Sequence, residues 1–285
     1  MAFEEGGAKL RRKPICTLAG HARGSPMQAK DVMTRTPITI DKDQRLDHVL
    51  ETMRKSRVSK LVVVEKGAVV GLLVDGDIAD ELGAIKNRGV PASHLHVSSA
   101  MRRRFEVVAP DTGLEQVREL LLDGNAGLVP VVHDQTCVGV VTCSDMLARV
   151  DSTKTIEEIM TKALHVVAPS DRVIHARRMM VDHRVERLPV LDGGKLVGIV
   201  GEMDVALGLA RFKDTVADKH QPAALQRFLV EDVMTRTLTT GRPEMTLTEA
   251  ARLMKQNDVG CLPVLRGERC AGIVTRGDLI RFAKP

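Results

Sequence analysis

One sequence unit occurs four times in this 285-residue chain, and an internal repeat constrains a fold more strongly than any single motif. The segment DVMTRTPITI at Asp31–Ile40 returns as DVMTRTLTT at Asp232–Thr240, and weaker copies lie at Ser99–Val108 and Glu158–Val167. Aligned on the shared methionine, every copy has an aspartate 44 residues later and a glycine six residues before that aspartate. The methionines are Met33, Met101, Met160 and Met234; the glycines are Gly71, Gly139, Gly198 and Gly272; the aspartates are Asp77, Asp145, Asp204 and Asp278.

Each copy also has the same local periodicity. Apolar residues 13, 16 and 20 positions after the methionine lie on one face of a helix. An apolar strand follows, as in LPVL from Leu188, and then a polar turn such as Asp192-Gly193-Gly194, which indicates a hairpin. A second helix is expected to begin at the aspartate. The predicted unit is therefore strand, helix, strand, strand, helix, an α+β fold, and such a small unit needs to pack against another one.

The repeats divide the chain into five segments. They are a basic N-terminal tail at 1–28, repeat 1 at 29–90, repeat 2 at 91–151, repeat 3 with a connector at 152–228, and repeat 4 at 229–285. The connector, Val205–Phe228, is expected to be largely helical.

Composition excludes several classes of protein. No apolar run approaches the length of a membrane span, and the N-terminus lacks the apolar core of a secretory signal. The five cysteines are odd in number and form no C-x-x-C motif, which argues against a disulfide framework or a zinc ribbon and favours a cytoplasmic protein. With five Phe and neither Trp nor Tyr, the chain is unsuited to reading single-stranded RNA by base stacking.

Motifs for catalysis and metal binding are weak or missing. The chain contains no G-x-x-x-x-G-K-[ST], no G-x-S-x-G and no H-E-x-x-H motif. Asp75, Asp77 and Asp80 lack the loop and closing glutamate of a calcium site. His94 and His96 have no further ligand at a convincing spacing. We therefore expect a non-enzymatic protein without a metal cofactor.

The segment Thr275-Arg276-Gly277-Asp278 permits two interpretations. Thr-x-x-Asp before an apolar run is a capping box, which satisfies the free N–H groups of a helix. A helix N-terminus also favours phosphate, and an aspartate there could accept hydrogen bonds from ribose hydroxyls. The aspartate recurs in all four copies, which favours a ligand for the aspartates.

The Met-Thr opening, the L-P-V strand and the G-h-h-T-x-x-D segment (h, apolar) resemble those of the CBS domain, named after cystathionine β-synthase, over about 31–285. The resemblance implies two Bateman modules, formed by repeats 1–2 and repeats 3–4, in a disk-like assembly closed either within one chain or across a homodimer. It also implies that an adenine nucleotide (AMP, ADP or ATP) or S-adenosylmethionine binds between paired repeats.

The four copies differ at the positions that this family uses. Val74 and Asp75 in repeat 1, and Gly201 and Glu202 in repeat 3, replace the hydroxyl and add a carboxylate. We therefore predict one strong nucleotide site per module, at Asp145 and at Asp278, whereas the clefts at Asp77 and Asp204 should be weaker or should favour a ligand with less charge. The further candidate binding residues are Thr142, Ser144, Thr275 and Arg276 on the helices, and Val58, Ser59, Lys60, Val185, Glu186 and Arg187 before the L-P-V strands. For Lys60 and Arg187, a phosphate contact and a solvated surface charge remain alternatives.

Basic residues suggest a second partner. Residues 1–28 carry a net charge of +3 out of +5 for the whole chain. A solvated tail is one interpretation, and contact with the phosphate backbone of structured RNA is the other. The candidate RNA contacts are Lys9, Arg11, Arg12, Lys13, Arg102, Arg103 and Arg104.

Two functional hypotheses follow from these patterns. The first is an energy sensor whose tail binds RNA or a ribosomal subunit, as a translation-silencing factor. The alternative is a regulatory subunit of an enzyme, a kinase or a transporter, similar to the gamma subunit of AMP-activated kinase.

Overall fold

Two β-sheets, each built by two repeats, form the framework of the molecule. The computed structural model describes residues 27–87, 89–123, 127–216 and 220–284. Repeats 1 and 2 share a five-stranded sheet of order β1-β2-β3-β5-β4, and repeats 3 and 4 share a four-stranded sheet of order β6-β7-β9-β8. The predicted α+β fold and the predicted pairing of repeats 1–2 and 3–4 are therefore confirmed.

The described elements follow the predicted order in each repeat, except for the first strand in repeats 2, 3 and 4. Repeats 1 and 2 contain α1 (Ala29–Val32), β1 (Thr39–Asp41), α2 (Leu46–Ser56), β2 (Lys60–Glu65), β3 (Ala68–Val74), α3 (Asp75–Gly83), η1 (Ile85–Asn87), η2 (Ala92–His94), α4 (Val97–Ala100), α5 (Leu114–Asp123), β4 (Leu128–His133), β5 (Thr136–Thr142), α6 (Cys143–Met146) and η3 (Leu147–Arg149). Repeats 3 and 4 contain α7 (Ile156–Ile159), α8 (Val173–His183), β6 (Arg187–Asp192), β7 (Lys195–Gly201), α9 (Glu202–Thr215), α10 (Gln221–Leu225), η5 (Val230–Asp232), α11 (Leu247–Gln256), β8 (Cys261–Arg266), β9 (Arg269–Thr275) and α12 (Arg276–Ile280).

The first strand of the predicted unit is complete only in repeat 1. There β1 pairs in parallel with β2, whereas in the other repeats the same segment makes a single parallel bridge, at Val108, Val167 and Gly241. Two residues after each of these bridges stands a proline, and at the equivalent position repeat 1 has Lys42. Proline has no N–H to donate and restricts the residue before it, so it ends the strand early. The prolines are Pro110, Pro169 and Pro243.

The segment that opens each repeat lies on the last strand of the other repeat in its module. Thr34 bridges to Val140 of repeat 2, and Arg102 bridges back to Leu72 of repeat 1. Repeats 3 and 4 exchange segments in the same way, through Thr161 with Ile273 and Thr235 with Ile199. Each pair of repeats is thus held together by two reciprocal backbone contacts.

This exchange explains the glycine that precedes every aspartate. A Cβ atom on Gly139 would lie 2.6 Å from the Sδ atom of Met33, and one on Gly272 would lie 2.6 Å from the Sδ atom of Met160. The same contact recurs between Gly71 and Met101 and between Gly198 and Met234, at 3.1 and 2.9 Å. The shared methionine and the shared glycine are therefore contact partners across each pair of repeats.

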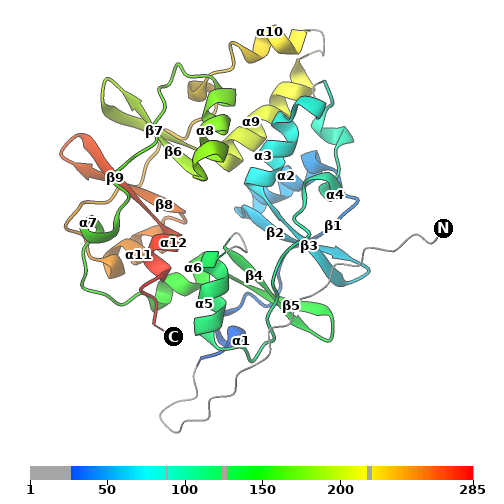
Figure 1. The fold of residues 1–285 in the computed structure, drawn as a ribbon, viewed down its shortest axis with the longest axis vertical. Coiled ribbons are helices and arrows are strands. Elements are labelled where there is room, and N and C mark those ends of the chain that lie inside the picture. The colour runs from blue at the N-terminus through cyan, green and yellow to red at the C-terminus, as the bar shows by residue number, and fades with distance from the viewer. Residues whose placement is uncertain (1–26, 88, 124–126, 217–219, 285) are drawn as a thin grey trace.

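The two modules pack into one disk through two apolar cores (Figure 1). One core combines repeat 1 with repeat 3, where helices α3 and α9 pack together, and the other combines repeat 2 with repeat 4. Ile78 of α3 and Val205 of α9 are fully buried in the first core, and Met146 of α6 and Leu279 of α12 are fully buried in the second. The disk therefore closes within a single chain.

Two arginines at equivalent positions clamp the modules together. Arg177 and Arg118 each stand 17 residues after the shared methionine of their repeat. Arg177 donates to the carbonyl oxygens of Ala79 (3.1 Å) and Asp80 (3.2 Å) in α3, and Arg118 donates to that of Ala283 (2.9 Å), just beyond α12. Each arginine thus connects a helix that carries one of the four shared aspartates to a repeat of the other module.

The connector after repeat 3 is helical over α9 and α10, as expected. The buried Lys213 of α9 donates to the carbonyl oxygens of Asn87 (2.5 Å) and Val90 (3.2 Å), in the segment that joins repeats 1 and 2. Among the described residues, no helix is both long and apolar enough to cross a membrane.

The glycine–methionine contact predicts a specific loss of stability. Gly139→Ala should lower the free energy of unfolding by about 1–3 kcal/mol, because the added Cβ overpacks the contact with Met33. Thermal and urea unfolding measure the change. Gly113→Ala is the matched control, because a Cβ there meets nothing within 4 Å and should change stability by less than about 0.5 kcal/mol. Equal stability of both variants would contradict the packing role.

Candidate functional site

All four repeats join the loop before their hairpin to the N-terminus of the following helix in the same way. The first N–H of the helix donates to the carbonyl oxygen of the residue directly before the strand. The four bonds are Asp75 to Ser59 (3.0 Å), Cys143 to Gly127 (3.4 Å), Glu202 to Glu186 (3.1 Å) and Arg276 to Gly260 (3.1 Å). This bond places the candidate binding residues that precede each strand beside the helix that carries the aspartate.

In repeats 2 and 4 the Thr-x-x-Asp segment forms a capping box. The N–H and the hydroxyl of Thr275 both donate to Oδ2 of Asp278, at 2.8 and 2.7 Å. Thr142 does the same to Oδ2 of Asp145, at 2.7 and 2.8 Å. Burial raises the pKa of Asp145, and the bonds from Thr142 oppose that shift. The threonine hydroxyl therefore faces the aspartate within the cap, and Ser144 lies beside it on α6.

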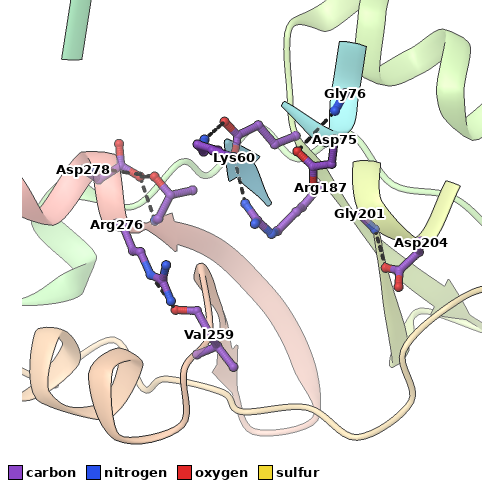
Figure 2. A network of polar contacts seen from close by, with 11 residues as sticks. Lys60, Asp75, Gly76, Arg187, Gly201, Asp204, Val259, Arg276 and Asp278 are labelled. Carbon is purple, nitrogen blue, oxygen red and sulfur yellow. Dashed lines mark hydrogen bonds and ion pairs between the residues drawn. The ribbon is translucent and has the colours of Figure 1, made fainter. Parts of the chain in front are cut away.

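Arg276, predicted as a phosphate-binding cation, contacts the loop of its own repeat. Its guanidinium donates to the carbonyl oxygen of Val259 (3.1 Å) and to Oδ1 of Asp258 (3.1 Å), as Figure 2 shows for Val259. The side chain is 25% exposed, and its ion pair with Asp258 holds it against the loop before β8. A phosphate at this helix would therefore compete with Asp258 for Arg276.

In repeat 1 the aspartate already has a cationic partner. Nε of Arg102 contacts both carboxylate oxygens of Asp77, at 3.0 and 2.7 Å. Arg102, predicted as an RNA contact, thus belongs to an ion pair across repeats 1 and 2. Repeats 1, 3 and 4 have a threonine at the position of Arg102, directly after the shared methionine. That departure is the sequence signal by which the pair could have been found.

A pocket of about 170 Å³ lies in the cleft between repeats 3 and 4. It combines the end of β7 and the start of α9 with the opening segment of repeat 4 and the loop before β8. Asp204, whose Oδ2 accepts the N–H of Gly201 at 2.8 Å, lies in its wall together with Arg187. The lining residues are Arg187, Ile199, Gly201, Asp204, Thr235, Thr237, Leu238, Thr239, Val259, Gly260, Cys261 and Pro263.

In each module a cationic side chain of the first repeat lies against a glycine of the second repeat. A Cβ atom on Gly260 would lie 2.7 Å from Nη2 of Arg187, and one on Gly127 would lie 3.4 Å from Nζ of Lys60. Lys60 and Arg187 are equivalent positions, and so are Gly127 and Gly260. Lys60 and Arg187 are only 20% and 27% exposed, which argues against freely solvated surface charges.

Carboxylates of the two modules meet at the centre of the disk. A Cβ atom on Gly76 would lie within 2.6 Å of both carboxylate oxygens of Glu202, so Glu202 of repeat 3 rests on the start of α3 in repeat 1. Burial, together with the nearby charge of Asp75, raises the pKa of Glu202 to about 8. Burial also raises the pKa of Asp75 to about 6, against the pull of Lys60 and Arg187. At neutral pH Glu202 is therefore mostly protonated.

Metal ligands and reactive thiols do not explain this site. The described ranges contain no group of three or more His, Cys, Asp or Glu side chains arranged to hold a metal ion. Cys143 and Cys261 lie near the same centre, and burial raises the pKa of both thiols. Because the thiolate is the reactive form, both cysteines are expected to act as small packing residues.

The protonated Glu202 predicts that stability falls in mildly alkaline solution. In the unfolded chain a glutamate ionises near pH 4.5, whereas folded Glu202 keeps its proton up to about pH 8. Between these values the folded state binds more protons, so the free energy of unfolding falls as pH rises and levels off above pH 8. Thermal melting from pH 6 to 9 should show this fall, and Glu202→Gln should flatten it by about 1–2 kcal/mol, since one pKa unit is about 1.4 kcal/mol.

The matched control is Asp151→Asn, which removes an exposed carboxylate whose pKa is lowered by Lys284. That carboxylate stays ionised throughout the range, so its removal should leave the slope of stability against pH unchanged. A slope in Glu202→Gln equal to that of the parent protein would overturn the assignment of the proton to Glu202.

Comparison with known proteins identifies relatives of this chain in sequence and in structure. Protein MJ1225 from Methanocaldococcus jannaschii is 26% identical over 276 residues, which is 90% of this chain and 96% of that protein. Its crystal structure matches with a TM-score of 0.78 at 24% identity, covering 90% of this chain and 99% of that one. A Thermofilum pendens protein, named for its place in the ribosomal RNA operon, is 27% identical over 85% of this chain and 86% of its own length.

The family model of the CBS domain matches four segments, at residues 29–84, 97–152, 156–211 and 230–284. These segments cover more than half of the chain and correspond to the four repeats seen in the sequence and in the two sheets. This chain therefore belongs to the CBS domain family.

Proposed function

We propose that the cleft between repeats 3 and 4 binds an adenine nucleotide or a related adenosyl ligand, and that its occupancy regulates a partner. The observation that carries this proposal is the pocket in which Asp204, Arg187 and the segment Thr235–Thr239 come together. These groups come from both repeats of the module. The pocket therefore offers a carboxylate, a cation and backbone groups to one small molecule.

The chemistry of the pocket suits an adenosine monophosphate. Oδ2 of Asp204 accepts the N–H of Gly201, and the carboxylate also accepts a hydrogen bond from the side chain of Thr235, which ribose hydroxyls would replace. Ile199 and Pro263 provide apolar walls for a base, and Arg187 provides a cation for a phosphate. The N-terminus of the 14-residue helix α9 adds its partial positive charge. The nearby carboxylate of Glu186, which is charged at neutral pH, opposes each further negative charge, and this favours AMP over ADP and ATP.

The clefts at Asp145 and Asp278, which the sequence ranked first, are proposed as additional sites. Each has one carboxylate oxygen fixed by its capping threonine, as Asp204 has one fixed by Gly201. They differ from the cleft at Asp204 because they contain the threonine hydroxyl. The cleft at Asp278 also contains the guanidinium of Arg276, which is held by Asp258. S-adenosylmethionine, which carries no phosphate, is the alternative ligand for every cleft.

Calorimetric titration with AMP, ADP, ATP and S-adenosylmethionine tests the proposal. Asp204→Ala should weaken binding of the preferred ligand at least tenfold, which corresponds to about 1.4 kcal/mol. Asp145→Ala and Asp278→Ala report on the other clefts, and Asp192→Ala, at the exposed end of β6, is the control. If Asp204→Ala binds as the parent protein does while Asp278→Ala or Asp145→Ala does not, the order of the clefts expected from the sequence holds instead.

Regulation would follow from the way the modules share their cores. A ligand that binds one arrangement of the modules better than another shifts the population between them, and a partner that contacts the disk responds to that shift. The clamps of Arg177 and Arg118 connect the helices that carry the aspartates to the opposite module. Movement of one such helix would therefore change side-chain contacts in both modules.

Structured RNA or a ribosomal subunit in the cytoplasm is the partner that we propose first. Lys9, Arg11, Arg12 and Lys13 lie outside the described residues. Of the arginine run, Arg102 is paired with Asp77, and Arg103 and Arg104 are exposed. The alternative partner is an enzyme, a kinase or a transporter, and the structure of MJ1225 is described as that of a candidate archaeal homolog of g-AMPK.

Co-sedimentation with ribosomes separates these partners. The full-length protein should sediment with ribosomal subunits at low salt, and binding should fall steeply with added salt as counterions compete for phosphate. Deletion of residues 1–28 should abolish sedimentation, and Arg103→Ala with Arg104→Ala should weaken it. Full-length protein that stays in the supernatant at low salt excludes the ribosome and favours the regulatory-subunit alternative.

A further inference from the structure

One carboxylate at the centre of the disk contacts a cation from each module. Oε1 of Glu186 lies 3.5 Å from Nζ of Lys60 in repeat 1, and Oε2 of Glu186 accepts a hydrogen bond from Nη1 of Arg187 at 2.9 Å. Lys60 and Arg187, both labelled in Figure 2, come from different elements, β2 and β6. Glu186 is therefore shared between module 1 and module 2.

The carboxylate of Glu186 is the most exposed member of the group. Its side chain is 54% exposed, compared with 20% for Lys60 and 27% for Arg187. The two cations lie beside glycines of the second repeats: a Cβ atom on Gly260 would lie 2.7 Å from Nη2 of Arg187, and one on Gly127 would lie 3.4 Å from Nζ of Lys60. An anion that approaches either cation from solution therefore competes with the exposed carboxylate.

The balance of charge at this centre leaves little room for an added anion. Lys60 and Arg187 face the carboxyl groups of Glu186, Asp75 and Glu202. Burial opposes ionisation of Glu186, yet Lys60 and Arg187 outweigh it and lower its pKa, so this carboxylate is charged at neutral pH. A phosphate placed at Arg187 meets that charge directly, and like charges in contact are repelled.

We propose that Glu186 is a built-in counter-ion that competes with ligand phosphate for Arg187 and Lys60 and so couples the two modules. In the ligand-free protein it neutralises both cations. A phosphate that binds Arg187 in the cleft of repeats 3 and 4 displaces one oxygen of Glu186, which then pairs with Lys60 alone. The Lys60–Glu186 pair becomes stronger, and a second phosphate at Lys60 is disfavoured. The proposal rests on nucleotide binding at this cleft as proposed above.

Glu186→Gln tests the competition, because glutamine keeps the size of the side chain and removes its charge. AMP should bind this variant roughly threefold to tenfold more tightly, a gain of about 0.6–1.4 kcal/mol. Adenosine, which lacks the phosphate, should bind the variant and the parent protein equally. Glu51→Gln, at an exposed ion pair on α2, is the control and should change neither ligand. An unchanged ratio of AMP affinity to adenosine affinity would overturn the role of Glu186.

Inorganic pyrophosphate separates this inference from the proposed function, because it contacts the cations and needs no adenosine pocket. Titration followed by phosphorus NMR should show tighter binding to Glu186→Gln than to the parent protein, and weaker binding to Arg187→Gln. Adenosine and AMP could bind neither protein while pyrophosphate still binds Glu186→Gln more tightly than the parent protein. That result would contradict the proposed nucleotide site and support the role of Glu186 as a counter-ion. If pyrophosphate binds all variants alike, the counter-ion fails whatever the nucleotides do.

Discussion

The contact between a methionine of one repeat and a glycine of its partner is the interaction on which the rest of this structure depends. It sets the opening segment of each repeat against the last strand of the other, so that two copies of a small unit share one sheet. The same contact builds the cleft. In repeats 3 and 4, Asp204 lies in the first turn of the helix that follows the strand bearing Gly198, and Thr235 on the opposite wall belongs to the segment that bears Met234. A ligand pocket of this kind therefore exists only in a pair of repeats.

A second constraint comes from the packing of modules. Repeat 1 shares a core with repeat 3, and repeat 2 with repeat 4, so the N-termini of α3 and α9 come together at the centre. Residues at equivalent positions then become neighbours. Asp75 and Glu202, which a single repeat would expose to solvent or to its own ligand, face each other across modules, and the charge of Asp75 adds to burial in raising the pKa of Glu202. The charge of any one cleft therefore depends on all the repeats.

Local features of the fold were predictable because their causes are local. The spacing of apolar residues defines the amphipathic helices, and the polar turns define the hairpins, which appear as predicted in every repeat. The contacts of individual side chains were not predictable in this way. Arg102 contacts Asp77, and Glu186 contacts Lys60, because particular repeats face each other. Spacing within one repeat does not indicate which repeats face each other. A signal for the first of these contacts was Arg102 itself, because the other three repeats have threonine at this position.

The same reasoning changes how a capping box and a ligand site relate. From the sequence they were alternatives for Thr275 and Asp278, yet the cap uses only Oδ2 of the aspartate and its bonds hold the carboxylate in place. A fixed carboxylate with a second oxygen turned elsewhere is better prepared for a ribose than a mobile one. In repeat 3 the carboxylate of Asp204 is held by the N–H of Gly201 and by a hydrogen bond from the side chain of Thr235, and Gly201 adds no side chain to the pocket. The loss of the capping hydroxyl in repeat 3 thus leaves the aspartate held and the pocket open, which supports our proposal that a ligand binds in the repeat that departs from the motif.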